Sequence, residues 1–394
     1  MNDSKLGNVG NNACDYFSLA QPSVQALHPY LPGKPIEELQ RELGLSNIIK
    51  LASNENPLGL SEKVIQAIQS ALKEGARYPD GNGYVLKQAL LDFYARKNQV
   101  FDLNQLTLGN GSNDVLELIA RAFVGSSDEV IFSEYAFAVY SIVTQAVGAK
   151  AVEVPAKDWG HDLVAISQSL TSKTKLIFLA NPNNPTGTAF SNSDFISFMD
   201  AVPSNVLVVL DEAYGEYIKE DTFPDGLSLL ANYPNLIISR TFSKAWGLAS
   251  MRVGYAISSP VIADLLNRVR QPFNVNLFAL VGAAAVLNDS DYLEKGVGLN
   301  SKGLKQLEDG LGALGLSFIP SKGNFIAFNV YPESANNKKA YTGMDIYQLL
   351  LQEGVIVRPL VNYKMPDFLR VSIGLPEENQ RFLSSLESVI KSLN

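Results

Sequence analysis

Short runs of apolar residues recur through the first two thirds of the chain, and stretches with the apolar spacing of a helix lie between several of them. Two of these helical stretches are residues 137–147 and 194–201. The apolar runs occupy residues 106–108, 129–132, 151–154, 175–179, 206–210, 236–238 and 253–257. Strands that are apolar throughout are buried on both faces, so the pattern predicts an α/β fold with a mostly parallel sheet covered by helices. Ligands of such sheets bind at the carboxyl ends of the strands.

The pattern changes after residue 275. Long helical stretches at 277–287 and 292–314 precede shorter apolar runs, and a last helix is expected at 377–393. The shorter runs, which predict strands, are residues 317–320, 325–329, 355–358 and 368–373. We therefore expect a large domain over residues 50–275 and a smaller α+β domain over residues 276–394.

Residues 1–49 are expected to form an arm. Residues up to Asn12 are polar and predict disorder, while the prolines within residues 28–35 predict an extended segment. A short helix is expected at 36–43, ended by Gly44. Such an arm packs either on a partner subunit or along the surface of its own chain, and the sequence leaves both open.

Composition narrows the class of protein. The 394 residues are 46% apolar and 18% charged, as in ordinary globular proteins, and the net charge of −8 disfavours binding to nucleic acid. One cysteine, Cys14, and two histidines, His28 and His161, supply no cluster for a structural metal. Neither a signal peptide nor a run of eighteen apolar residues is visible, so we expect a cytoplasmic protein without a membrane span.

Two glycine-containing segments have different meanings. Residues 109–114 (Gly-Asn-Gly-Ser-Asn-Asp) lie between a predicted strand and a helix expected at 115–123, an order that directs backbone N–H groups at an anion. Residues 310–315 match the glycine pattern of dinucleotide-binding proteins, but a helical run precedes them and a strand follows. That order is the reverse of what the motif requires, so the segment indicates the end of a helix.

The densest group of candidate chemical residues lies at 241–255, directly after an apolar run. Thr241, Ser243 and Arg252 are suited to hold a phosphate dianion by charge-assisted hydrogen bonds. Lys244, buried close to another cation, is expected to lose its proton and become a nucleophile. The combination predicts a lysine that binds pyridoxal phosphate covalently.

Polar residues at two preceding strand ends fit the same cofactor. Asp211 is suited to pair with a protonated pyridine nitrogen, and Tyr214 and Asn184 to donate to the phenolic oxygen. Phe137 is suited to lie against the ring. Each alone also fits a helix cap, a turn or a core residue. Their order at successive strand ends favours one shared site.

These motifs resemble those of the class I/II aminotransferases, the fold-type-I enzymes that use pyridoxal phosphate. The carriers are Asn-Pro-Asn-Asn-Pro-Thr-Gly at 181–187, Asp-Glu-Ala-Tyr at 211–214 and the segment 241–255. Within that class the chain is most similar to the histidinol-phosphate aminotransferase family. This closer resemblance rests on residues 27–30, 51–57, 77–81, 135–140, 357–359 and 369–374.

The resemblance implies a mostly parallel seven-stranded sheet in the large domain and a role for each matching residue. Lys244 would be the covalent and proton-transferring residue, assisted in catalysis by Asp211 and Tyr214. The cofactor would be held by Lys244, Asn184, Asp211, Tyr214, Thr241, Ser243, Arg252, Ser112, Asn113 and Phe137, with Tyr78 reaching the site of the neighbouring subunit in a homodimer. Substrate would be bound by Arg370, Arg358, Tyr30 and Asn56.

The implied reaction is amino transfer from glutamate, followed by amination of imidazole-acetol phosphate to histidinol phosphate. Arg370 would pair with either the carboxylate or the phosphate, with Arg358 and Tyr30 added for the dianion. An aromatic amino-acid aminotransferase and a threonine-phosphate decarboxylase remain alternatives. A non-catalytic regulator would need a DNA-binding domain, for which residues 1–49 leave no room.

Overall fold

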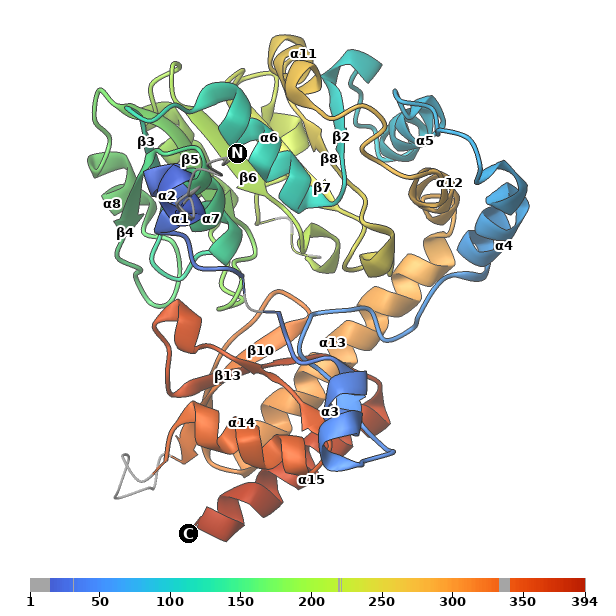
Figure 1. The fold of residues 1–394 in the computed structure, drawn as a ribbon, viewed down its shortest axis with the longest axis vertical. Coiled ribbons are helices and arrows are strands. Elements are labelled where there is room, and N and C mark those ends of the chain that lie inside the picture. Colours follow the sequence, from blue (N-terminus) through green and yellow to red (C-terminus); the bar gives the residue numbers. More distant parts are fainter. Residues whose placement is uncertain (1–14, 31, 219, 221, 333–340, 394) are drawn as a thin grey trace, which may run out of the picture.

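The computed structural model describes residues 15–30, 32–218, 220, 222–332 and 341–393 (Figure 1). The disorder expected up to Asn12 lies outside these residues. The chain is built as two units that Figure 1 shows one above the other, with the long helix α13 (Ser290–Ala313) running from the upper to the lower.

The upper unit is organised around the predicted mostly parallel sheet, which has seven strands in the order β2-β8-β7-β6-β5-β3-β4. Strand β8 is antiparallel to both of its neighbours, and the other pairs are parallel. Leu176 and Phe178 contact the core on one face, while Ile177 and Leu179 contact the core on the other. The strands are β2 (Leu106–Gly109), β3 (Glu129–Ser133), β4 (Lys150–Val154), β5 (Thr174–Ala180), β6 (Leu207–Asp211), β7 (Leu236–Thr241) and β8 (Gly254–Ile257).

Helices cover both faces of this sheet, as the continuous apolar runs predict. One face carries α6, α7 and α11, and the other carries α8 and α9, while α4, α5 and α12 form a third cluster beside β2 and β8. The helices are α4 (Glu62–Ala71), α5 (Tyr84–Ala95), α6 (Ser112–Phe123), α7 (Ala138–Ala146), α8 (Leu163–Gln168), α9 (Asn192–Ala201), α10 (Gly226–Leu229), α11 (Pro260–Val269) and α12 (Leu277–Val286), with short 3-10 turns at Leu72–Glu74, Leu103–Gln105, Gly215–Tyr217 and Ala249–Met251.

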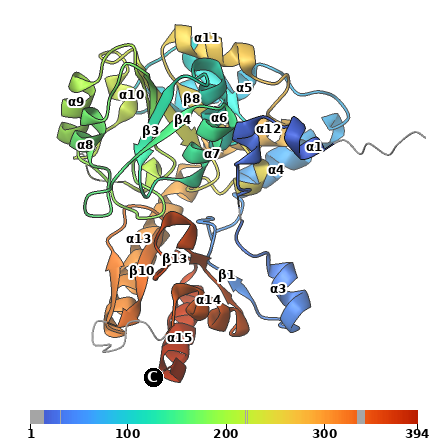
Figure 2. The ribbon, with the colours of Figure 1, turned by 60° about the vertical axis from the view of Figure 1, so that its left-hand side comes forward.

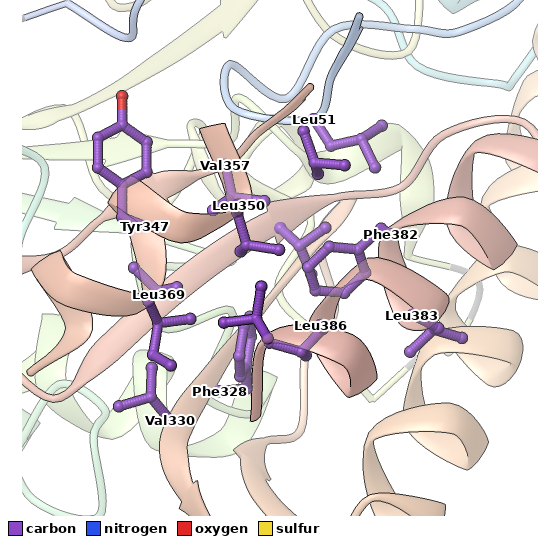
Figure 3. Packing of buried hydrophobic residues seen from close by; sticks show 14 of the residues in the cluster. Leu51, Phe328, Val330, Tyr347, Leu350, Val357, Leu369, Phe382, Leu383 and Leu386 are labelled. Atoms are coloured by element: carbon purple, nitrogen blue, oxygen red, sulfur yellow. The ribbon is translucent and has the colours of Figure 1, made fainter. Parts of the chain in front are cut away.

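The lower unit is the predicted α+β domain. Its antiparallel sheet has the order β12-β13-β10-β9 and packs against α13, α14 and α15 around side chains such as Phe328, Leu386 and Phe382 (Figure 3). The elements are β9 (Leu316–Ile319), β10 (Phe325–Pro332), α14 (Gly343–Gln352), β11 (Val355–Ile356), β12 (Arg358–Pro359), the 3-10 turn Val361–Tyr363, β13 (Phe368–Ser372) and α15 (Pro376–Leu393).

The arm divides between the two units. The short helix α2 (Pro22–Gln25) packs against α7 in the upper unit, and the short helix α1 (Tyr16–Leu19) precedes it. Helix α3 (Ile36–Leu43) has the bounds that the sequence predicts, with Gly44 at φ 67° as its C-cap, and lies beside the lower unit (Figure 2). Strand β1 (Ile49–Lys50) pairs in parallel with β11, and Leu51 is buried in the lower core (Figure 3).

Packing places α12 with the upper unit, although it begins after the expected boundary at 275. The helix contacts α4 and α5, and its Ala283 and Val286 belong to their apolar cluster. Tyr292, near the start of α13, joins that cluster, whereas Leu307 and Leu311 join the core of the lower unit. We propose that the two units divide within α13. The sequence shows that the pattern of apolar residues changes at 275, but it does not show in which of the two cores α12 is buried.

Candidate active site

A cavity of about 200 Å³ opens at the carboxyl ends of the central strands. Ala180, Asp211 and Thr241, the last residues of β5, β6 and β7, line it, as expected for an open α/β sheet. The predicted residues that line it are Tyr30, Ser112, Asn113, Phe137, Asn184, Asp211, Tyr214, Thr241, Ser243, Lys244, Arg252, Arg358 and Arg370. The structure therefore brings together side chains that are more than 300 residues apart in the chain.

Lys244 directs its amine into this cavity from the loop after β7. Its Nζ donates to the carbonyl oxygen of Ser53 at 3.0 Å. Burial, together with the positive charges of Arg370 and Arg252 and against the opposing effect of Glu55, lowers the pKa of Lys244 to about 7. A large fraction of the amine is therefore uncharged and nucleophilic at neutral pH.

Asp211 is buried at the end of β6, with 4% of its surface exposed. Its Oδ2 accepts a hydrogen bond from the Tyr140 hydroxyl at 2.9 Å, but its Oδ1 has no partner among the described residues. Burial raises the pKa of Asp211 to about 6, against the lowering effect of the Tyr140 hydrogen bond. A buried carboxylate oxygen without a partner is unfavourable, so Oδ1 suits a cationic N–H group in the cavity.

Tyr214 and Asn184 lie on the loops that follow β6 and β5. The Tyr214 hydroxyl accepts from Asn54 Nδ2 at 2.9 Å, and burial raises the pKa of Tyr214 to about 12, so it stays a hydroxyl donor at neutral pH. Asn184 Oδ1 accepts from the Arg370 guanidinium, which leaves the amide nitrogen of Asn184 to donate. Both residues thus have donors suited to an acceptor oxygen in the cavity.

An anion cup occupies one end of the cavity. Helix α6 begins at Ser112, so backbone N–H groups at its N-terminus are directed there. Ser243 Oγ accepts from Arg252 Nη1 at 3.1 Å, which leaves the Ser243 proton for another acceptor. A Cβ atom at Gly111, where φ is +86°, would collide with the Arg252 guanidinium. The cup therefore needs glycine at this position.

Arg358 and Arg370 approach from the lower unit as a pair. They are directly opposite each other on the antiparallel strands β12 and β13, and both are buried, with 7% and 6% of their surface exposed. Burial lowers the pKa of Arg370, and Arg358 contributes to the shift. Like charges at directly opposite positions are unfavourable, and Arg370 Nε has no partner among the described residues. This arrangement suits an anionic substrate group.

Tyr30 and Phe137 complete the wall of the cavity. The Arg358 guanidinium lies 5.5 Å from the centre of the Tyr30 ring, a cation–π contact that holds the arm beside the arginine pair. Phe137 is the N-cap residue of α7 and meets the Tyr140 ring edge-on at 6.0 Å. Both rings are therefore anchored next to the polar groups.

Two predicted residues lie outside the cavity of their own chain. Tyr78 is 83% exposed and stacks on Phe273 with ring centres 4.7 Å apart. Asn56 is buried elsewhere, where its Nδ2 donates to the carbonyl of Ala245 at 2.9 Å and its Oδ1 accepts from the backbone of Leu58 at 3.0 Å. The expectation that Asn56 contacts substrate does not fit this position, because its Nδ2 is used by the loop that carries Lys244 and its Oδ1 by its own loop.

Tyr140, Asn54 and Ser53 line the cavity without having been predicted to do so. Tyr140 is in the motif at 135–140, one helical turn after Phe137, and this spacing could have indicated that both reach one site. Asn54 and Ser53 are in the motif at 51–57, but sequence alone does not show which of its polar residues faces inward. The positive φ of Asn54, 56°, sets that direction.

The side chains fit a pyridine ring that carries an aldehyde and a phosphate. The partnerless Asp211 Oδ1 suits a protonated ring nitrogen, the Lys244 amine suits the aldehyde, and the cup at Gly111 suits the phosphate. Among the described residues, no group of three or more His, Cys, Asp and Glu side chains is placed to hold a metal ion. In the same ranges, no helix is long and apolar enough to cross a membrane.

The model of the family described as aminotransferase class I and II matches residues 46–386. The chain belongs to the class I and II aminotransferases. A histidinol-phosphate aminotransferase of Pseudomonas aeruginosa is 57% identical over 378 residues, which cover 95% of this chain and 99% of that protein. One from Idiomarina loihiensis is 54% identical over 373 residues, with 95% and 98% covered. Within the class, the chain belongs to the histidinol-phosphate aminotransferase family.

Solved structures agree with this assignment. The histidinol-phosphate aminotransferase of Sinorhizobium meliloti, a crystal structure in complex with pyridoxal-5'-phosphate, matches with a TM-score of 0.83 and 28% identity over 96% of this chain and 99% of that chain. A variant of Thermus thermophilus aspartate aminotransferase matches with a TM-score of 0.77 and 21% identity, which shows the fold alone. The predicted family resemblance and fold class are confirmed.

The environment of Lys244 predicts an unusual titration. In the cofactor-free protein, the rate at which an amine-specific reagent acylates Lys244 should rise with pH, with a midpoint near pH 7. The reason is that the amine becomes reactive as it loses its proton. Replacing Arg370 with Met should move the midpoint upward, since it removes a neighbouring positive charge. Peptide mapping measures each lysine in one sample, and Lys305, whose pKa is raised by Asp309, provides the comparison. A Lys244 midpoint near that of Lys305 would contradict the assignment.

Proposed function

We propose that the chain binds pyridoxal phosphate at Lys244 and transfers an amino group between glutamate and the pair of histidinol phosphate and imidazole-acetol phosphate. The observation that carries this proposal is one cavity that holds a nucleophilic lysine, a partnerless buried aspartate oxygen and an opposed arginine pair. The names of relatives that are more than 50% identical support the choice of substrate. The reaction is a step of histidine biosynthesis.

When bound, the cofactor supplies an aldehyde that accepts amino groups and a ring that withdraws electrons. Lys244 would hold the aldehyde carbon, and its amine, once displaced by the substrate amine, would be the base that carries the substrate's α-proton. Asp211 Oδ1 would pair with a protonated ring nitrogen, and this positive partner would keep the carboxylate ionised despite its burial. Tyr214 and Asn184, which line the cavity with Phe137, would donate to the phenolic oxygen, and Phe137 would provide an apolar surface for the ring.

The anion cup orients the cofactor. Thr241, Ser243 and Arg252 supply two hydroxyls and a guanidinium, and Ser112 and Asn113 add groups at the N-terminus of α6. Charge-assisted hydrogen bonds of this kind are stronger than neutral ones, so these residues would hold the phosphate of the cofactor firmly. Asn56 contributes indirectly by holding the carbonyl of Ala245, next to Lys244 in the chain.

The arginine pair accounts for two substrates with different anions. Glutamate presents a carboxylate, which the fork of Arg370 is able to bind alone, whereas histidinol phosphate presents a dianion, which matches Arg370 and Arg358 together. Tyr30 lies against Arg358 and closes this side of the site. The second arginine favours histidinol phosphate over an aromatic amino acid, whose carboxylate needs only one.

We further propose a cytoplasmic homodimer in which Tyr78 serves the phosphate site of the neighbouring subunit. Two observations support the shared site: Tyr78 lies outside its own cavity, and it is 83% exposed. It stacks on Phe273, which is also exposed, and the exposed apolar residues Leu72, Tyr84 and Val85 are close to it in the chain. Exposed aromatic side chains of this kind are typical of interfaces between subunits.

The half-reaction with histidinol phosphate tests the proposed activity. Cofactor-loaded enzyme should lose its visible absorbance when histidinol phosphate is added and regain it with 2-oxoglutarate. Lys244→Ala should still bind the cofactor through the cup but lose about 1,000-fold or more in rate, because the proton-carrying amine is gone. Lys305→Ala, a change at the surface, is the matched control. A higher kcat/KM for phenylalanine would favour the aromatic aminotransferase, and carbon dioxide released from threonine phosphate would favour the decarboxylase.

Arg358→Ala separates the two substrates. The variant should lower kcat/KM for histidinol phosphate about 10- to 100-fold, the range expected for a lost charged hydrogen-bond partner, and lower that for glutamate much less. Steady-state kinetics with each substrate measures both values. Arg268→Ala, which removes an exposed arginine on α11, is the control. Equal losses for the two substrates would show that Arg358 does not distinguish the dianion.

Hybrid dimers test the role of Tyr78. Mixing Tyr78→Ala chains with Lys244→Ala chains after reversible dissociation should restore activity, because one site in each hybrid combines an intact Lys244 with the partner subunit's Tyr78. Either variant taken through the same procedure alone gives the baseline. If Tyr78 served its own chain's site, both sites of the hybrid would be defective and mixing would restore nothing.

A further inference from the structure

The segment 51–56 is attached to the lower unit and reaches into the catalytic site of the upper one. Leu51 is buried in the lower core, its carbonyl accepts from the Ser372 backbone at 2.8 Å, and its N–H donates to Ile356. Asn324, also in the lower unit, donates to the carbonyl of Asn54 at 3.0 Å. Asn54 is therefore held by the lower unit, although it contacts Tyr214 of the upper one.

The contacts of Asn54 define which way its amide faces. Its backbone N–H donates to Ser372 Oγ at 2.8 Å, and Ser372 Oγ donates its own proton to Asn54 Oδ1 at 2.9 Å. With Oδ1 occupied by this donor, the amide nitrogen faces the Tyr214 hydroxyl, 2.9 Å away. Asn54 is 1% exposed and Ser372 is 4% exposed, so water does not compete for these bonds.

The direction of this hydrogen bond determines what Tyr214 is able to do. Because the Tyr214 oxygen accepts from Asn54, its own proton is directed elsewhere, and the residue lines the cavity that holds Lys244. If the amide of Asn54 were reversed, its oxygen would attract the Tyr214 proton and withdraw it from the cavity. Asn54 also keeps a left-handed backbone conformation, with φ of 56°. This conformation is tolerated by asparagine better than by most residues.

We propose that Asn54 and Ser372 act as a pair of positioning residues that orient the Tyr214 hydroxyl as a donor toward the phenolic oxygen of the cofactor. The proposal rests on the proposed function, since it requires pyridoxal phosphate at Lys244. The hydrogen bond from Asn54 to Tyr214 crosses between the two units. The placement of the lower unit, which carries the substrate-binding arginines, is thereby linked to the electronic state of the cofactor in the upper unit.

A donor to the phenolic oxygen draws negative charge from that oxygen, which weakens its hold on the proton of the neighbouring lysine nitrogen. Loss of the donor should therefore raise the pH midpoint of the visible-absorbance transition of the cofactor-loaded enzyme. This midpoint is measured without substrate, so it does not depend on turnover. A neutral hydrogen bond corresponds to a shift of about 0.5 to 1 pH unit.

The experiment compares four variants and one control variant of the cofactor-loaded enzyme with the wild type by pH titration of the visible band. Tyr214→Phe should raise the midpoint most, and Asn54→Ala and Ser372→Ala should raise it by about 0.5 unit or more. Ser372→Thr keeps the hydroxyl and should stay near the wild-type midpoint. Ser385→Ala, a buried serine on α15 in the same unit, is the control for general loss of packing.

A double variant tests whether Ser372 acts through the Tyr214 hydroxyl. In a Tyr214→Phe background, Ser372→Ala should produce no further shift, because its effect passes through the missing hydroxyl. The proposal would be overturned if Ser372→Ala shifted the midpoint equally with and without the Tyr214 hydroxyl. It would also be overturned if neither Asn54→Ala nor Ser372→Ala shifted the midpoint. A wild-type enzyme whose visible band fails to respond to glutamate would instead refute the proposed function. If Asn54→Ala does not fold, the two Ser372 variants still give the answer.

Discussion

Positive charge collected in a small, partly dehydrated cavity is the constraint on which the site depends. Arg358 and Arg370 face each other from adjacent strands of the lower unit, while Lys244 and Arg252 approach from the upper unit. Asp211 is the acidic residue among those that line the cavity within the described ranges. This excess of positive over negative charge in a buried site is unfavourable unless an amine loses its proton and anions bind. Burial and the charges of Arg370 and Arg252 thus lower the pKa of Lys244, and the arginines create two separate places for anions.

The fold keeps these anion sites apart. The cup at Gly111 and Arg252 is built from the start of α6 and the loop after β7, both fixed to the central sheet. The arginine pair belongs to a different sheet, in the lower unit. An anion at the cup is therefore held by residues of the upper unit, whereas an anion at the arginine pair is held by residues of the lower unit. This separation suits a permanently held phosphate on one side and an exchanging substrate on the other.

Much of this arrangement could be predicted from sequence, because local patterns carry it. The apolar runs locate every strand of the large sheet, and the polar residues at their ends, such as Asp211 and Lys244, locate the site. Contacts between distant segments were not accessible in the same way. Tyr140 was missed because its hydrogen bond to Asp211 joins a helix to a strand 71 residues later. The core that α12 fills and the inward direction of Asn54 likewise depend on tertiary packing and on one backbone angle.

Asn54 and Asn56 show how close positions in one motif take different roles. Both are buried asparagines in the same loop, and in both the amide oxygen and the amide nitrogen each have a hydrogen-bond partner. Asn56 holds a backbone carbonyl next to Lys244 and thus supports the loop, while Asn54 contacts a hydroxyl that has a proton to direct. A carbonyl oxygen is only an acceptor, whereas a hydroxyl is both a donor and an acceptor. The partner of the Tyr214 hydroxyl therefore determines whether that hydroxyl presents its proton or its oxygen to the cavity. For this reason an amide beside Tyr214 is able to influence chemistry, whereas one beside Ala245 influences geometry.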